Sequence, residues 1–170
     1  MQNAPHPEPW LRGRFEDLPA IHLAVLHALE LTTENIDHWC MGLTTDDFHS
    51  QPFGLPSLSF HLRHISRSLD RLLTYAEGNQ LTASQLSALK GESSPDGSVK
   101  SILDEFHASL ENARARIRGF ASTSLELPRS VGRRQLPTTV GGLLVHIADH
   151  TQRHTGQIVT TAKLLAALRK

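Results

Sequence analysis

The sequence predicts an all-α protein, a four-helix bundle with a long crossover connection between its second and third helices. Four long segments repeat apolar residues at steps of three and four, no segment shows strand-like alternation, and residues 79–97 form a connection long enough to cross the bundle. The 170 residues are 39% hydrophobic and 20% charged, which is typical of one globular domain. We therefore expect a single domain over residues 1–170, with residues 1–17 as an N-terminal extension.

The first predicted helix covers residues 18–42. Pro19 suits a first helical turn and Gly42 suits a C-terminal cap. The stretch TTDDFHSQPFGLP that follows is rich in turn-forming residues. The apolar stripe of this helix consists of Leu18, Ile21, Val25, Ala28, Ile36 and Trp39.

The second predicted helix begins after Ser57, a plausible N-cap, and closes at Gly78. In the connection that follows, LTASQLSALK is compatible with a short surface helix and GESSPDGS with a loop. The stripe of the second helix consists of Leu58, Leu62, Ile65, Leu69, Leu72 and Ala76.

The third predicted helix runs from about Ser98 to Phe120, and the helical pattern then stops until Pro137. Thr138 or Thr139 can cap the last helix, which continues to the C-terminus. Its apolar stripe has a gap that His150 and His154 fill, at positions where a bundle normally carries Leu or Ile. The stripe itself consists of Leu143, Ile147, Ile158, Thr161, Leu165 and Leu168.

His150 and His154 are the strongest chemical signal in the sequence. Residues four apart on a helix have Cβ atoms roughly 5–6 Å apart, so both rings can reach one metal ion. Burying both without a partner would cost roughly 1–3 kcal/mol each. His146 lies on the same face, but eight residues of helix rise about 12 Å, so a third ligand must come from another helix.

The second helix offers His61 and His64 as that third ligand, and the other helices offer further candidates. The helical wheel places His61 nearer the centre of the apolar stripe, so periodicity alone mildly favours His61. For an isolated histidine the simpler interpretation is a hydrogen-bonded core or boundary residue. This interpretation applies to His22, His27, His38, His49 and His107.

The chain resembles the DinB/YfiT-like superfamily of metal-binding four-helix bundles. Members tend to have a Ser or Thr cap seven residues before a histidine, as in Ser57 and His64. Their last helix often carries spaced histidines, a small or basic residue and Gly-Gln, similar to His146, His150 and His154 followed by TGQ. The resemblance implies metal ligands His64, His150 and His154, in place of His61.

The resemblance also bears on the neighbouring residues. We expect His61 and His146 to line the pocket or to hydrogen-bond the ligands, and a structural role for both is an equal alternative. Many members have arginine at the position of Thr155 and histidine at the position of Arg153, so contacts around the ligands can differ here.

Three neutral histidines leave a coordination sphere incomplete, which is typical of a catalytic metal site. Imidazole ligands favour a divalent transition metal, with Zn or Ni first and Fe, Cu or Mn also compatible. The resemblance implies a metal-dependent thiol S-transferase or hydrolase that acts on a small molecule, including low-molecular-weight thiols such as bacillithiol or mycothiol. No catalytic residue is assigned. The alternative is a non-catalytic, metal-stabilised binding or stress-response module.

Few other side chains suggest chemistry. We expect surface charges at Asp70, Asp149, Arg63, Arg67 and Arg153, because charged residues are mostly exposed. Cys40 is expected to be a small buried hydrophobic residue.

Charge and composition argue against several partners. Seventeen basic residues balance seventeen acidic ones, which disfavours nucleic acid and anionic membranes, although the name of the similar family refers to DNA damage. No segment is apolar enough for a membrane span, and a secretion signal is not evident. We expect a cytoplasmic protein and, from the resemblance, a homodimer.

Overall fold

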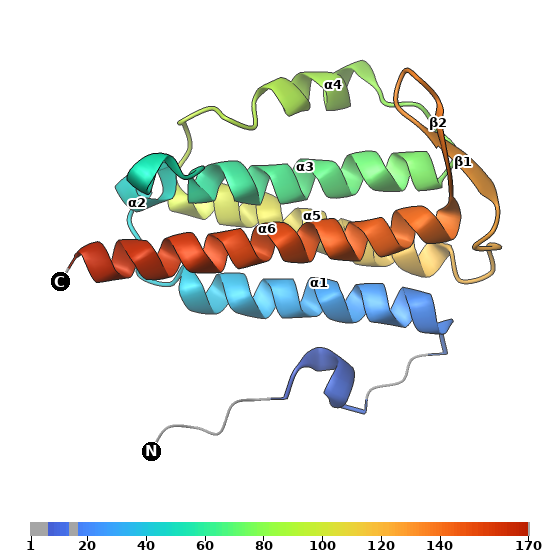
Figure 1. Ribbon diagram of the computed structural model, residues 1–170, viewed down its shortest axis with the longest axis horizontal. Coiled ribbons are helices and arrows are strands. Elements are labelled where there is room, and N and C mark those ends of the chain that lie inside the picture. Colours follow the sequence, from blue (N-terminus) through green and yellow to red (C-terminus); the bar gives the residue numbers. More distant parts are fainter. Residues whose placement is uncertain (1–6, 14–16, 170) are drawn as a thin grey trace.

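The computed structural model describes residues 7–13 and 17–169, and it is mainly helical, as predicted (Figure 1). The predicted extension, residues 1–17, is described only in part. The helices are α1 (Ala20–Trp39), α2 (Thr45–His49), α3 (Leu58–Ala76), α4 (Ala83–Lys90), α5 (Val99–Gly119) and α6 (Val140–Leu168). The short 3-10 helices are η1 (Pro9–Leu11) and η2 (Pro52–Gly54), and the strands are β1 (Pro128–Val131) and β2 (Leu136–Thr139).

The long helices α1, α3, α5 and α6 pack side by side. Helix α6 lies between α1 and α3, and α5 contacts both α3 and α1 (Figure 1). Helices α1 and α6 run in one direction and α3 and α5 in the other, because the chain returns along α4 before it enters α5 (Figure 1). This arrangement puts α3 beside α6, the two helices that carry the predicted ligands.

The core between these helices is apolar and fully buried. The short helix α2 adds Phe48 to it, in a stretch for which the sequence indicated only turns. The largest side chains that are essentially inaccessible to solvent include Leu29, Ile36, Phe48, Leu62, Leu69, Phe106, Ile117 and Leu144.

Side-chain caps set the helix starts where the sequence indicated them. Ser57 Oγ accepts a hydrogen bond from the backbone N–H of Phe60 at 3.2 Å, and Thr139 Oγ1 accepts from Gly142 at 3.0 Å. Helix α1 begins later than predicted, at Ala20, because Pro19 serves as the residue before the helix. At the other end of α6, Leu168 is 58% exposed and lies outside the core, although the sequence placed it on the stripe.

The hairpin β1–β2 is a feature that the sequence analysis missed. Pro128 pairs with Thr139 and Val131 with Leu136, in antiparallel register. Its four-residue strands are too short to show a clear alternation of apolar residues, and each contains a proline. The hairpin packs on α3, where Arg129 Nε donates to the backbone carbonyl of Ala76 at 2.6 Å.

The crossover contains the predicted short helix. Helix α4 begins with a reciprocal cap between Thr82 and Gln85 and packs on α3. Gln85 Nε2 donates to Asp70 Oδ2 at 2.7 Å and to Thr74 Oγ1 at 2.8 Å. The crossover is therefore attached to α3 along its length. Within the described residues, every helix is too short or too polar to cross a membrane.

Candidate metal centre

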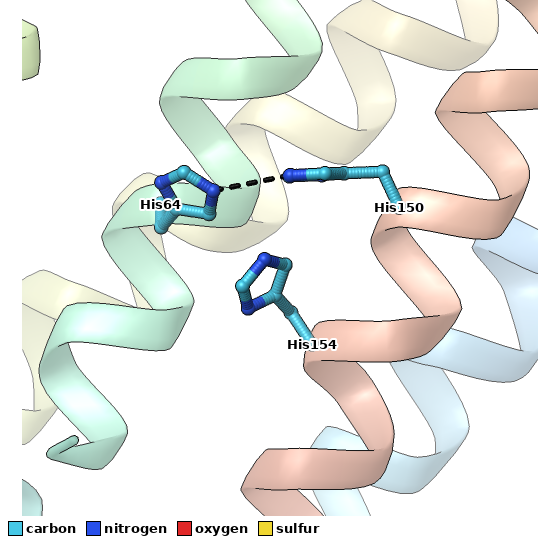
Figure 2. A group of neighbouring side chains, drawn as sticks. All are labelled: His64, His150 and His154. Atoms are coloured by element: carbon cyan, nitrogen blue, oxygen red, sulfur yellow. Dashed lines mark hydrogen bonds between the residues drawn. The ribbon is translucent and has the colours of Figure 1, made fainter.

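Helices α3 and α6 bring three of the predicted histidines together. His64 comes from α3, and His150 and His154 come from successive turns of α6 (Figure 2). Each offers one ring nitrogen, and these nitrogens all lie within 4.8 Å of one another. Figure 2 shows the rings in the space between the two helices, with His64 and His150 closest.

The spacing of the nitrogens fits one ion. His64 Nε2 lies 3.1 Å from His150 Nε2. Bonds of about 2.0–2.1 Å in a tetrahedral arrangement place neighbouring ligand nitrogens about 3.3 Å apart. The donor set is all imidazole, which suits divalent transition metals. The nitrogen of His154 lies within 4.8 Å of the other two, so a three-nitrogen site requires this ring to move closer to them.

Each of these rings also contacts a second polar group through its Nδ1 atom. His64 Nδ1 lies 2.7 Å from Glu92 Oε2, and His154 Nδ1 lies 3.0 Å from His61 Nδ1. His150 Nδ1 lies 3.5 Å from Ser68 Oγ. Partners of this kind fix the tautomer and orientation of metal-binding histidines, because they occupy the nitrogen that faces away from the ion.

Glu92 is the residue of this site that the sequence analysis missed. It lies in the segment interpreted as loop, yet it is only 5% exposed. Burial alone would raise the pKa of Glu92, but hydrogen bonds from His64 and Arg71, together with their charges, hold that pKa below its ordinary value. Arg71 Nη1 lies 2.7 Å from Glu92 Oε1. No local pattern marks this glutamate, because the crossover brings it to α3 from a distant part of the sequence.

The electrostatics around the cluster favour neutral rings at His61, His150 and His154. Burial, and then the proximity of His154 and His64, lower the pKa of His61 to about 4. Burial followed by the neighbouring charges likewise lowers the pKa of His150 to about 4 and also lowers that of His154. Neutral rings retain the lone pairs that a metal ion needs.

His61 and His146 occupy different environments. His61 is buried, as the helical wheel indicated, and its ring contacts His154. His146 is exposed, with its ring centroid 5.5 Å from that of His150. The structure thus places His61 against the cluster and His146 at its outer edge.

The two histidines of α6 lie at the boundary of the core, where the sequence had placed them inside it. His150 and His154 are half-buried, whereas Thr151 and Thr155 are 1% and 2% exposed. A helix has 3.6 residues per turn, so repeated steps of four drift off the buried face. Thr155 instead contacts Thr32 of α1, with their Oγ1 atoms 3.2 Å apart. The histidines therefore remain reachable from solvent.

Arg63 was predicted to be a surface charge, and this prediction is wrong. Its side chain is 5% exposed and donates to the backbone carbonyls of Ser94 and Asp96 and to Asp96 Oδ1. Gly97 permits this contact, because its φ is +86° and a Cβ there would lie 3.0 Å from Arg63 Nη2. Arg63 thus fixes the end of the crossover that follows Glu92.

The remaining candidates do not enter the cluster. Asp149 and Arg153 form an ion pair on the exposed side of α6, and Asp70 pairs with Arg116. Arg67 is partly buried and bonds Glu105 and the carbonyl of Ala88. Cys40 is buried, as predicted.

The sequence matches the family model described as the DinB superfamily over residues 28–158. This match spans most of the chain and includes all three histidines of the cluster. The protein belongs to the DinB superfamily. A search of curated protein sequences finds no match.

Proposed function

We propose that this protein binds a single metal ion and acts on a small molecule. The reaction is either the transfer of a small thiol to that molecule or its hydrolysis. The observation that carries the proposal is the cluster of His64, His150 and His154, with ligand nitrogens within 4.8 Å of one another. We interpret the packed helices α1, α3, α5 and α6, with the crossing connection through α4, as the DinB-like four-helix bundle.

A divalent ion bound here would act as a Lewis acid that lowers the pKa of a coordinated water or thiol. The chain contributes three imidazole nitrogens and holds each ring in place. Glu92 orients His64, and His61 orients His154, through the short contacts described above. Because the three histidines are half-buried, water or a substrate could approach an ion held by them from solvent.

The half-buried position also supports a catalytic role over a purely structural one. The apolar core is assembled from side chains of all the long helices, and it is continuous without the histidines. A structural ion is usually enclosed by four protein ligands. A metal-stabilised module without activity remains the competing function.

Metal analysis of protein purified without a histidine tag tests the site. We expect about one equivalent of metal in the wild type, in His146→Ala and in His107→Ala, and little or none in His150→Ala and His64→Ala, which each lose a ligand. His107 is a suitable control because it pairs with Asp37 on another part of the surface. Equal metal content in wild type and His150→Ala would refute the proposal.

A second experiment separates the two functions. Cobalt-loaded protein titrated with a small thiol such as cysteine should develop a thiolate-to-cobalt absorption band, which requires a free coordination position. Chelation should leave the helical circular dichroism unchanged. Unfolding on chelation, with no change in the cobalt spectrum on adding thiol, would favour the structural role.

A further inference from the structure

A cavity of about 420 Å³ lies directly beside the histidine cluster. Its walls come from the segment after η2, with Leu55 and Pro56, and from α6, with Arg153, Gly156 and Thr161. His61 forms a further part of the wall, and the same ring lies 3.0 Å from His154. At most one side chain, that of His61, would therefore separate a molecule in this cavity from the cluster.

The cavity combines an apolar surface with one cationic group. Leu55, Pro56 and the open backbone at Gly156 present mostly carbon, and a Cβ at Gly156 would meet no atom within 4 Å. The hydroxyls of Thr160 and Thr161 and the amide of Gln157 add polar groups, and Arg153 adds a positive charge. Pockets for small organic ligands commonly have this composition, an apolar lining with a few polar groups that fix orientation.

The charge around the cavity favours an anion. Arg153 lines the cavity and directly precedes His154 in α6, so its positive charge lies beside both the cavity and the cluster. Glu92, the buried acid of the site, is already paired with Arg71. A divalent ion on neutral histidines would add further positive charge.

The acidic group nearest to Arg153 does not block an incoming anion. Asp149 pairs with Arg153 through Nη2, and the two side chains are 56% and 57% exposed. An exposed ion pair of this kind contributes little free energy, typically about 0–1 kcal/mol. A guanidinium has five N–H donors, so Arg153 can also bind a ligand carboxylate.

We propose that this cavity binds a small organic carboxylate, with its apolar body against Leu55, Pro56 and Gly156 and its carboxylate held by Arg153. The inference deepens the proposed function, because it identifies the cavity as the substrate site beside the metal centre. The predicted specificity is for the negative charge, so the corresponding neutral amide is a poor ligand.

Calorimetric titration with 4-phenylbutyrate and its neutral amide, 4-phenylbutyramide, tests the inference. We expect wild-type protein to bind the carboxylate at least about tenfold more tightly than the amide, since hydrogen bonds to charged groups are stronger than neutral ones. Arg153→Gln should lose this preference and leave amide binding unchanged. Arg133→Gln, an exposed arginine in the hairpin turn, should behave as wild type.

Substitutions at Gly156 test the cavity itself. Gly156→Leu places a side chain where the glycine leaves open space, and it should abolish binding of both compounds. Gly156→Ala should leave binding nearly unchanged. Leucine and alanine both have higher helix propensity than glycine, so neither substitution should destabilise α6. Loss of binding in Gly156→Leu without loss of thermal stability would therefore assign the effect to the filled cavity.

Each titration is done with zinc-loaded and with metal-free protein, which separates this inference from the proposed function. A carboxylate preference that persists without metal and depends on Arg153 supports the cavity, even if metal analysis refutes the metal centre. A preference that Arg153→Gln leaves intact, or no binding of 4-phenylbutyrate to wild type, overturns the inference while leaving the metal centre to its own test.

Discussion

Glu92 Oε2 lies 2.7 Å from His64 Nδ1, so the crossover connection reaches the histidine cluster through a buried carboxylate. The other oxygen of Glu92 pairs with Arg71, at 2.7 Å. Arg71 thus holds the carboxylate in place, and the carboxylate orients His64. Carboxylate partners of this kind increase the basicity of a ligand histidine and fix its ring.

Replacement of this carboxylate should weaken metal binding. In Glu92→Gln we expect metal affinity to fall about 10- to 100-fold, because the amide keeps the shape of the side chain but loses its charge. Competition with a chromogenic chelator measures the affinity. The matched control is Glu105→Gln, which removes a carboxylate that pairs with Arg67 at the surface. Equal affinities in Glu92→Gln and wild type would show that the contact does not tune the site.

A second prediction concerns Arg63, which joins α3 to the end of the crossover. Arg63→Met keeps most of the apolar stem but leaves the carbonyls of Ser94 and Asp96 without their buried donor. We expect a loss of about 1–3 kcal/mol in the free energy of unfolding, measured with urea. Faster hydrogen exchange over residues 91–97 should accompany it. Arg133→Met, at an exposed position, should change stability by less than about 0.5 kcal/mol, and an equal loss in both variants would contradict the assignment.

The long helices α1, α3, α5 and α6 could be predicted from the sequence because their signals are local. Ser57, Ser98 and Thr139 each cap a helix through a side chain that bonds a backbone N–H three residues later, and these residues stand at the start of the apolar repeats. The hairpin could not be predicted, because its short strands are positioned by contacts with α3. Arg129, which bonds the carbonyl of Ala76, is such a contact.

The candidate site, like the fold, could be predicted only where its signals are local. His150 and His154 are four residues apart, so their proximity follows from helix geometry alone. Their degree of burial depends on how α6 is rotated against α1, and the contact of Thr155 with Thr32 reflects that rotation. Glu92 approaches His64 only because the crossover folds back, and a single sequence contains no periodicity that records such a contact.

A third prediction concerns the thiol of Cys40. Burial, and then the negative charge of Asp37, raise the pKa of Cys40 to about 12 from an ordinary value near 9. The neutral thiol therefore contributes stability that is present below about pH 9 and is lost as the pH rises toward 12. At pH 9.5 the folded protein should show no thiolate absorbance near 240 nm and should resist iodoacetamide. Protein unfolded in guanidinium should show both, and Cys40→Ala supplies the baseline. Rapid alkylation of the folded protein at this pH would be evidence against a buried thiol.

A fourth prediction separates the stability of the fold from metal binding. Phe106 of α5 is 0% exposed in the core, whereas His150 is half-buried at its boundary. Phe106→Ala should lower the free energy of unfolding of the metal-free protein by about 3–5 kcal/mol, because it removes a large buried side chain and leaves a cavity. The folded variant should still bind metal, since the cluster lies between α3 and α6.

His150→Ala should have the opposite profile. It should abolish metal binding yet change the stability of the metal-free protein by no more than about 1 kcal/mol, because a half-buried imidazole contributes little apolar burial. Metal content after dialysis measures the binding, and urea unfolding in the presence of chelator measures the stability of the metal-free protein. If His150→Ala unfolded the metal-free protein as readily as Phe106→Ala, the histidines would belong to the core that holds the helices together.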